Sequence, residues 1–325
     1  MKKQLISMVL MAAMTVSMLT GCKTAGGKKA EAPSSGNQAA AEAKTEDEEK
    51  ASEGGEDYSY HWKLATTESS DYYMTQLSQE FLDIVEEKTG GKVTGEVFAS
   101  GQLGGLVDAL EGLEMGNIDI VMDGVSSLSA VDDIFNVWCL PFLYDNKEHQ
   151  YRFWDNHFDE VSDMVAEQSG FRLVSVIDGM NRELASTVPV ESMADLKGLK
   201  IRVPNIPGYV RIWECLGAAP IPMSLSEVYT SIQTGVVQGQ ENDIALTLSL
   251  KFYEVAPYCV MTDHVAYEGS FYFNEEEYQS YPDELKQIIQ EAGEEIKLKS
   301  RSIIKEQETE CMKQIEDMGV TICRP

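Results

Sequence analysis

The chain has 325 residues, of which 43% are hydrophobic and 9% aromatic, so it can bury the cores of two ordinary domains. Its 54 acidic and 26 basic residues give a formal net charge of -28, which argues against binding to nucleic acid or to anionic lipid headgroups. The charge places no such limit on small ligands, because surface fields fade within about 8 Å in physiological salt.

The N-terminus has the pattern of an export signal. Lys2 and Lys3 precede an apolar stretch over residues 5–19 that is short for a membrane span, and small residues precede Cys22. The ending Leu-Thr-Gly-Cys resembles the bacterial lipobox, in which the cysteine is acylated. We therefore expect a lipoprotein signal peptide over residues 1–21 and a lipid on Cys22; a plain secretory signal with a coincidental cysteine is the alternative.

The next segment, residues 22–57, is expected to be a disordered tether. After Cys22 it contains no large apolar side chain, so nothing offsets the entropy of ordering its backbone. The remainder of the chain keeps 19 basic and 45 acidic residues. The protein would then be exported and held by its lipid alone at the outer face of the bacterial cell membrane, or in the periplasm.

Strand-like and helix-like segments alternate from residue 58 onward. Strands are predicted at 60–66, 92–98 and 118–122, with helices at 70–90 and 104–116. Ser70 or Asp71 is the expected N-cap of the first helix, and Gly90 its end. This β-α-β-α-β order predicts a mainly parallel sheet covered by helices.

The pattern begins again after a helix that stops at Gly170. Strands are predicted at 171–177, 183–188, 199–204 and 219–223, and helices near 209–217 and after Ser224, which forms a capping box with Glu227. Segments 235–243 and 258–273 are expected to be strands that cross between the two halves, and 282–319 a helix of about 50 Å, long enough to span both.

Two α/β halves with several crossings predict an α/β fold of two domains with a ligand cleft between them, like that of periplasmic binding proteins. Ligands of such folds lie beyond the carboxyl ends of the strands and can be enclosed by hinge closure. We expect domain I to comprise residues 58–178 plus about 268–307, and domain II about 179–267 plus about 308–325.

Enzyme and metal signatures are weak. The Gly-rich stretch SGQLGGLVDAL matches neither nucleotide fingerprint and favours a tight strand-to-helix turn. Four scattered histidines lack metal-ligand spacing, and G-x-S-x-G is absent. We therefore expect no metal, no cofactor and no catalysis. The five cysteines after Cys22 form no C-x-x-C and are expected to be buried free thiols, with a Cys311–Cys323 bridge left open.

Three polar residues stand out in apolar, strand-like surroundings. Arg182 and Arg202 lie twenty residues apart, and Asn242 follows forty residues later. An arginine in a strand is more often solvated or paired with an internal acid than kept for a ligand, so these residues alone leave the choice open.

A family resemblance bears on that choice. The segments FLDIVEEKTGGKV, SGQLGG, LPFLY, ADLKGLKIRVPN, LGAAPIPMSLSEVYTSIQTGVVQGQEN and KFYEVAPY occur in family order across residues 58–325. Together they resemble the solute-binding subunit of tripartite ATP-independent periplasmic (TRAP) transporters, of the dicarboxylate-binding-protein type. Such proteins close two domains around an organic acid and present it to a membrane permease.

The resemblance implies particular ligand contacts. Arg202 matches the arginine that receives the ligand carboxylate, Arg182 a second arginine near it, and Asn242 and Asn205 positions that reach the ligand. The chain departs from the family in two places. Leu225 stands where many members carry Phe, and the segment before Arg182 is one residue longer than usual.

The leading hypothesis is therefore an extracytoplasmic protein that captures a small carboxylate, such as a dicarboxylate or a sugar acid, and delivers it to a TRAP permease. The alternative is the ligand-sensing module of a membrane receptor. Loop residues Thr67, Glu68 and Asp123 are weaker ligand-binding candidates, since each could equally be a helix cap or a solvated side chain.

Overall fold

The structure, a computed structural model, describes residues 58–325. The predicted signal peptide, the lipidation site Cys22 and the tether over 22–57 lie outside the described residues. Within the described part, no helix is both long enough and apolar enough to cross a membrane.

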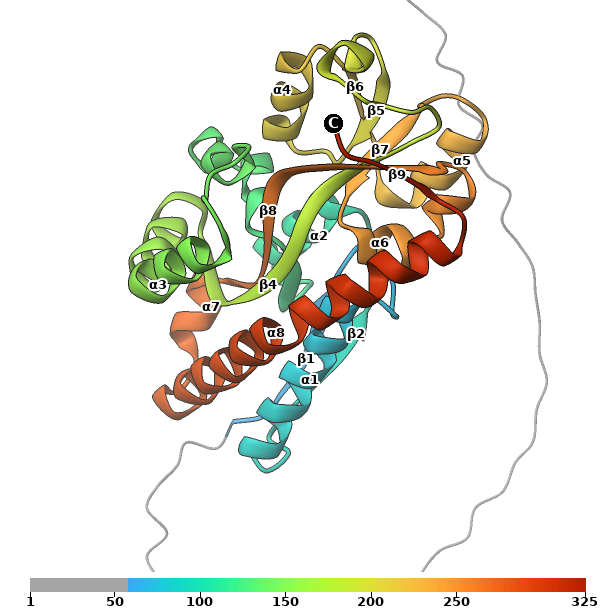
Figure 1. The fold of residues 1–325 in the computed structure, drawn as a ribbon. Helices are drawn as coiled ribbons and strands as arrows, with labels where there is room; N and C mark the ends of the chain where they lie inside the picture. The colour runs from blue at the N-terminus through green and yellow to red at the C-terminus, as the bar shows by residue number, and fades with distance from the viewer. Residues whose placement is uncertain (1–57) are drawn as a thin grey trace, which may run out of the picture. The chain divides into compact units, whose positions relative to one another are not determined.

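The described chain forms one sheet of nine strands (Figure 1). The strands are β1 (Tyr60–Ala65), β2 (Val93–Phe98), β3 (Ile120–Gly124), β4 (Phe171–Ser186), β5 (Lys200–Val203), β6 (Ala219–Pro222), β7 (Gly239–Asn242), β8 (Tyr258–Asn274) and β9 (Thr321–Cys323). Their order is β2-β1-β3-β8-β4-β7-β5-β6, with β9 paired to β8.

The sheet is parallel at its two ends and antiparallel in the middle. β1 pairs in parallel with β2 and β3, and β5 in parallel with β6 and β7. Between these groups β4 and β8 run antiparallel to each other and to β7 and β3, respectively. The prediction of a mainly parallel sheet thus holds only for each βαβ group, because the two long crossing strands return through the centre.

The long strand β4 differs from the sequence prediction. Segments 171–177 and 183–188 were predicted as separate strands, but Phe171–Ser186 is continuous. Its register against β8 shifts at three places, including between Asp178 and Asn181. Such bulges bend a strand without ending it, and the shift between Asp178 and Asn181 falls in a segment that resembles a loop in the sequence.

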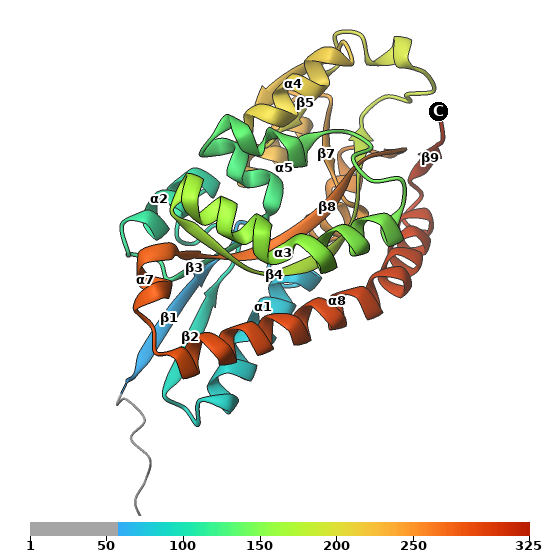
Figure 2. The same cartoon turned by 90° about the vertical axis from the view of Figure 1, so that its left-hand side faces the viewer.

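Helices cover both faces of the sheet. They are α1 (Tyr73–Lys88), α2 (Leu106–Glu114), α3 (Lys147–Ser169), α4 (Pro207–Cys215), α5 (Val228–Gln233), α6 (Ile244–Ser249), α7 (Glu275–Ser280) and α8 (Asp283–Asp317). Short 3-10 helices occur at η1 (Val125–Ala130), η2 (Asp133–Cys139), η3 (Met193–Leu196), η4 (Leu225–Glu227) and η5 (Phe252–Glu254). The 35-residue α8 extends from the end of the sheet that carries β1 and β2 to the end that carries β9 (Figure 2).

Two predicted helix ends are confirmed and one is wrong. Gly170 ends α3 with a positive φ of 74°, and Ser224 forms the predicted capping box, its backbone N–H donating to Glu227 at 3.1 Å. The predicted N-cap of the first helix is wrong: Tyr72, not Ser70 or Asp71, holds that position without a side-chain cap bond. Tyr72 is instead placed by a tertiary hydrogen bond, which its hydroxyl donates to the buried Asp243 of another segment.

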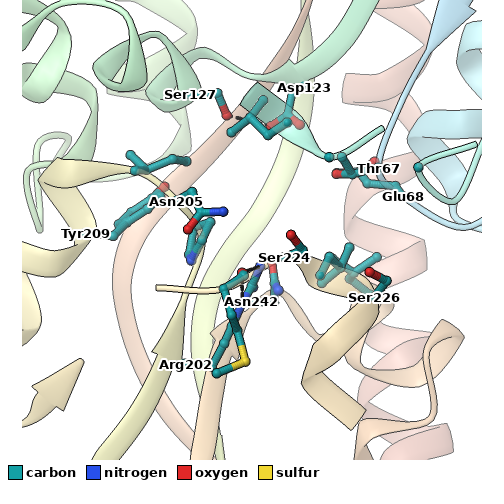
Figure 3. A pocket seen from close by; sticks show the side chains of 18 of the residues that line it. Thr67, Glu68, Asp123, Ser127, Arg202, Asn205, Tyr209, Ser224, Ser226 and Asn242 are labelled. Atoms are coloured by element: carbon teal, nitrogen blue, oxygen red, sulfur yellow. Dashed lines mark hydrogen bonds between the residues drawn. The ribbon is translucent and has the colours of Figure 1, made fainter. Parts of the chain in front are cut away.

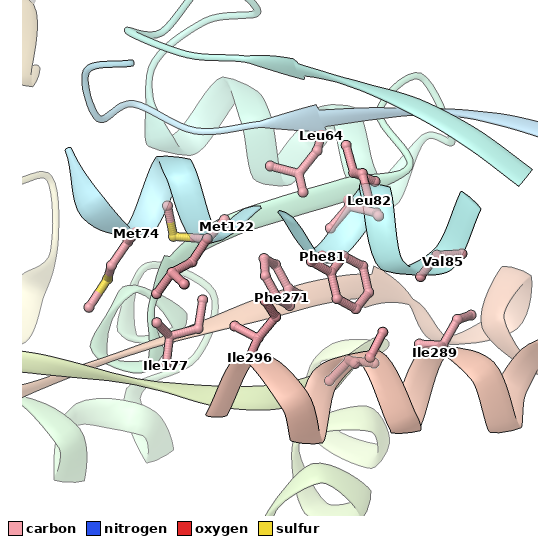
Figure 4. Packing of buried hydrophobic residues seen from close by; sticks show 14 of the residues in the cluster. Leu64, Met74, Phe81, Leu82, Val85, Met122, Ile177, Phe271, Ile289 and Ile296 are labelled. Atoms are coloured by element: carbon pink, nitrogen blue, oxygen red, sulfur yellow. The ribbon is translucent and has the colours of Figure 1, made fainter. Parts of the chain in front are cut away.

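The largest core lies between α1, α8 and one face of the sheet (Figure 4). Phe81 of α1 stacks on Phe271 of β8 with ring centroids 4.3 Å apart, and Ile289 and Ile296 of α8 are fully buried in the same cluster. Successive residues of a strand face opposite sides, so the next residue of β8, Tyr272, belongs to a second core under α3.

The cysteines depart from expectation at one position. All five described cysteines are free, and the Cys311–Cys323 bridge is not formed. Three are buried and Cys311 is partly so, but Cys215 is exposed. Its apolar neighbours Ile212 and Trp213 are buried, so neighbouring residue types are a poor guide to the burial of a helical residue.

Candidate functional site

A small cavity of about 130 Å³ lies where strands from both parallel groups end (Figure 3). Its walls come from the segments after β1, β3, β5 and β6, from β4, β7 and β8, and from the loop before α2. Pockets for drug-sized ligands occupy roughly 300–1,000 Å³, so this cavity suits a smaller molecule.

The structure brings all eight predicted residues to this one cavity. Its lining includes the stronger candidates Arg182, Arg202, Asn205, Leu225 and Asn242 and the weaker candidates Thr67, Glu68 and Asp123. Segments up to 200 residues apart in the sequence, from Thr67 to Tyr267, therefore converge on one small space. Contact of each residue with a ligand stays a prediction.

Arg182 is held by an internal acid. Its Nε and Nη2 donate to the two carboxylate oxygens of Glu241 at 2.6 and 2.9 Å, and its guanidinium lies over the rings of Tyr209 and Tyr267. Burial lowers the pKa of Arg182, but Glu241 more than offsets this and the pKa lies well above its ordinary value. The planar fork of Arg182 is thus occupied by a carboxylate of the chain itself.

Arg202 is a buried cation without a carboxylate partner. It is 3% exposed, and its Nε and Nη2 donate to the backbone carbonyl of Met223 at 3.0 and 2.9 Å. None of the ion pairs within residues 58–325 includes it. Burial is the main cause that lowers its pKa to about 10, so the guanidinium stays charged at neutral pH. A ligand carboxylate in the cavity would complete this site.

Two acids line the part of the cavity across from Arg202 (Figure 3). Asp123 accepts hydrogen bonds from the backbone N–H of Gly124 at 2.7 Å and from the hydroxyl of Ser127 at 2.6 Å, and burial raises its pKa. Glu68 accepts one from the hydroxyl of Tyr267 at 3.3 Å, and burial raises its pKa well above the ordinary range. Neither acid is hydrogen-bonded to Arg202.

Several groups at the site, in its lining or directly behind it, were not predicted from the sequence. Glu241 directly precedes Asn242 and also lies 3.3 Å from His264 Nε2, while Tyr209 donates to the hydroxyl of Ser126 at 2.9 Å. Glu241 lies inside an apolar, strand-like segment, and this position was a sequence signal that it pairs with a buried cation such as Arg182. The sequence offered none for Tyr209, whose position depends on the packing of α4 against η1.

Neutral hydrogen-bonding groups make up much of the remaining wall. They belong to Thr67, Ser100, Ser126, Ser127, Asn205, Ser224, Ser226 and Asn242. Within residues 58–325 no cluster of side chains could hold a metal ion. The arrangement can pair one carboxylate with a buried guanidinium and exchange hydrogen bonds with a polar tail.

Comparison with known proteins gives consistent matches. The family described as "Bacterial extracellular solute-binding protein, family 7" (DctP) matches residues 64–325. The sialic acid-binding periplasmic protein SiaP of Vibrio cholerae is 30% identical over 244 residues, 75% of this chain and 76% of its own. Solute-binding protein RD1_1052 of Roseobacter denitrificans is 37% identical over a shorter match, which spans 54% of each chain.

Solved structures show the same fold. A TRAP periplasmic solute-binding protein of Sulfitobacter sp. NAS-14.1, with bound β-D-galacturonate, has a TM-score of 0.77 and 29% identity, covering 81% of this chain and 88% of its own. The Roseobacter protein RD1_1052, solved with bound L-galactonate, has a TM-score of 0.78 and 28% identity, covering 82% and 89%. The predicted two-domain α/β cleft fold is confirmed by these neighbours.

Proposed function

Because the chain belongs to family 7 of the bacterial extracellular solute-binding proteins, whose members bind small organic acids and deliver them to TRAP permeases, we propose that its cavity captures a sugar acid. The observation that carries this proposal is Arg202, a desolvated cation on the cavity wall that no carboxylate of the described chain neutralises. The matched structures hold galacturonate and L-galactonate.

The guanidinium of Arg202 receives the ligand carboxylate. Guanidinium offers a planar fork that matches a carboxylate and is more weakly hydrated than ammonium, so it functions in a dry cavity. Arg182 keeps its ion pair with Glu241 and adds positive charge to this end of the cavity. Asn205 and Asn242 orient the ligand. Leu225 adds an apolar wall contact.

The hydroxyl groups of the cavity wall indicate which class of organic acid the cavity binds. Serine and threonine hydroxyls both donate and accept, so they suit a tail of hydroxyl groups. A sugar acid presents one carboxylate and several hydroxyls in a small volume. This favours a sugar acid over a simple aliphatic acid, whose tail would exchange no hydrogen bonds with these hydroxyls.

Release to the permease requires the cavity to open. Its walls come from both parallel groups of the sheet, which β4, β8 and α8 connect. The predicted domain boundaries at 178/179 and 267/268 fall inside β4 and β8, beside the register shift between Asp178 and Asn181. Bending of these strands would separate domain I from domain II.

Binding and release of the acid need no cofactor and no covalent step. A lipid on Cys22 would keep the protein near its permease.

A thermal-shift screen of the soluble protein tests the proposal. D-galacturonate, D-galactonate, L-gulonate and N-acetylneuraminate would be compared with succinate and acetate. A ligand at 100 times its dissociation constant adds about 2.7 kcal/mol to stability, and small-angle scattering should show a smaller radius of gyration. If none of the sugar acids raises the melting temperature, or if a bound acid is recovered chemically altered, the proposal is refuted.

A further inference from the structure

One oxygen at the edge of the cavity has no partner. Glu68 is 4% exposed, and while its Oε1 accepts from the hydroxyl of Tyr267, its Oε2 is buried without a hydrogen-bond partner among residues 58–325. Glu68 lines the cavity. A buried polar oxygen without a partner is destabilising, so a ligand group that bonds to it would bind favourably.

Two acids lie near this oxygen, and the cation that also acts on it, Arg182, is already paired. Asp123 lines the same side of the cavity, and it and Asp243 raise the pKa of Glu68, after burial as the main cause. The basic residues of the cavity lining are Arg182, already paired with Glu241, and Arg202, which lies across the cavity (Figure 3). The two sides of the cavity therefore differ in charge.

We propose that Glu68 selects the tail of the ligand by exchanging a hydrogen bond with a hydroxyl and disfavouring a second carboxylate. This inference rests on the proposed function, because it assumes that the first carboxylate lies against Arg202. The ligand is then a polyhydroxy monocarboxylate. Dicarboxylates, which the sequence alone allowed, are excluded.

A hydroxyl fits Glu68 in either protonation state. It donates to an ionised carboxylate and accepts from a protonated one. A second ligand carboxylate can only accept, so an ionised Glu68 repels it. Even beside a protonated Glu68 it would lie desolvated next to Asp123 with no unpaired arginine on that side. An ammonium would require an ionised Glu68, which burial and the neighbouring acids oppose.

A matched pair of ligands isolates this contact. D-galactonate and galactarate share six carbons and the same secondary hydroxyls, but carbon 6 carries a hydroxyl in the first and a carboxylate in the second. By calorimetry, the wild-type protein should bind galactonate at least tenfold more tightly than galactarate. Glu68→Gln, which keeps the shape but removes the acid, should reduce that ratio at least fivefold.

Two control variants complete the experiment. Glu87→Gln makes the same chemical change at an exposed residue of α1 outside the cavity lining and should leave the ratio unchanged. Arg202→Met should weaken both ligands together. If the screen selects L-gulonate instead, glucarate is its carbon-6 carboxylate counterpart and the same ratios apply.

The outcomes separate the two proposals. Equal wild-type affinity for both acids, or a ratio unchanged by Glu68→Gln while Arg202→Met still abolishes binding, overturns the role of Glu68 and leaves the proposed function standing. Binding of no sugar acid at all overturns the proposed function and this inference with it.

Discussion

Replacing Arg202 by methionine should separate ligand binding from folding. Methionine has a similar length but no charge and no donor, so the variant removes the cation that faces the cavity. A ligand carboxylate would then be desolvated without a partner. Truncating one member of a buried, hydrogen-bonded charge pair costs roughly 2–5 kcal/mol, which corresponds to a loss of about 30-fold to several thousand-fold in affinity.

The effect on the ligand-free protein should be small, because two changes oppose each other. Burial is the main cause that lowers the pKa of Arg202 from 12.5 to about 10, so burial and the surrounding charges together disfavour the charged side chain in the empty cavity by about 3 kcal/mol. Methionine removes that cost. It also removes two hydrogen bonds to the carbonyl of Met223, each worth about 1.5 kcal/mol or more for a charged donor. The free energy of unfolding should change by no more than about 1–2 kcal/mol.

Calorimetry with the sugar acid found in the screen, and urea unfolding without ligand, measure the two quantities on the same preparations. Arg202→Lys serves as the matched variant, since it keeps the charge but lacks the fork and should give an intermediate affinity. Unchanged affinity of Arg202→Met would refute the assignment of the carboxylate site. Loss of the folded state would show that Arg202 is a structural residue.

Two further predictions concern buried acids. Glu241→Gln leaves Arg182 buried without a counter-charge and should lower the free energy of unfolding by about 3–5 kcal/mol, measured by urea denaturation; an unchanged midpoint would contradict the pairing. Burial raises the pKa of Glu268 from 4.5 to about 7, so the folded state holds this proton more tightly than the unfolded chain. Its contribution to stability is full below about pH 4.5 and is lost as the pH rises through about 7, a change of about 3 kcal/mol. Glu268→Gln should flatten this part of the stability profile, and a slope equal to that of the wild type would count against the shifted pKa.

The sequence by itself predicted the features that depend on residues a few positions apart. The alternation of strands and helices, the end of α3 at Gly170 and the capping box at Ser224 are of this kind. Their energies come from backbone hydrogen bonds and side-chain contacts within one or two turns, so the pattern of neighbouring residues is sufficient. The resemblance to family segments, which occur in the family's order, further predicted that Arg202 and Asn242 converge on one cavity.

Only the tertiary structure decided which charges are satisfied. Arg182 and Arg202 have equivalent strand-like surroundings in the sequence, yet one pairs with Glu241 and the other reaches only the carbonyl of Met223. Glu241 is 59 residues from Arg182, and the two meet because β4 and β7 pair in a particular register. The continuity of β4 and the antiparallel centre of the sheet have the same origin. Hydrogen bonds between distant strands set them, and no local pattern encodes which distant strands will pair.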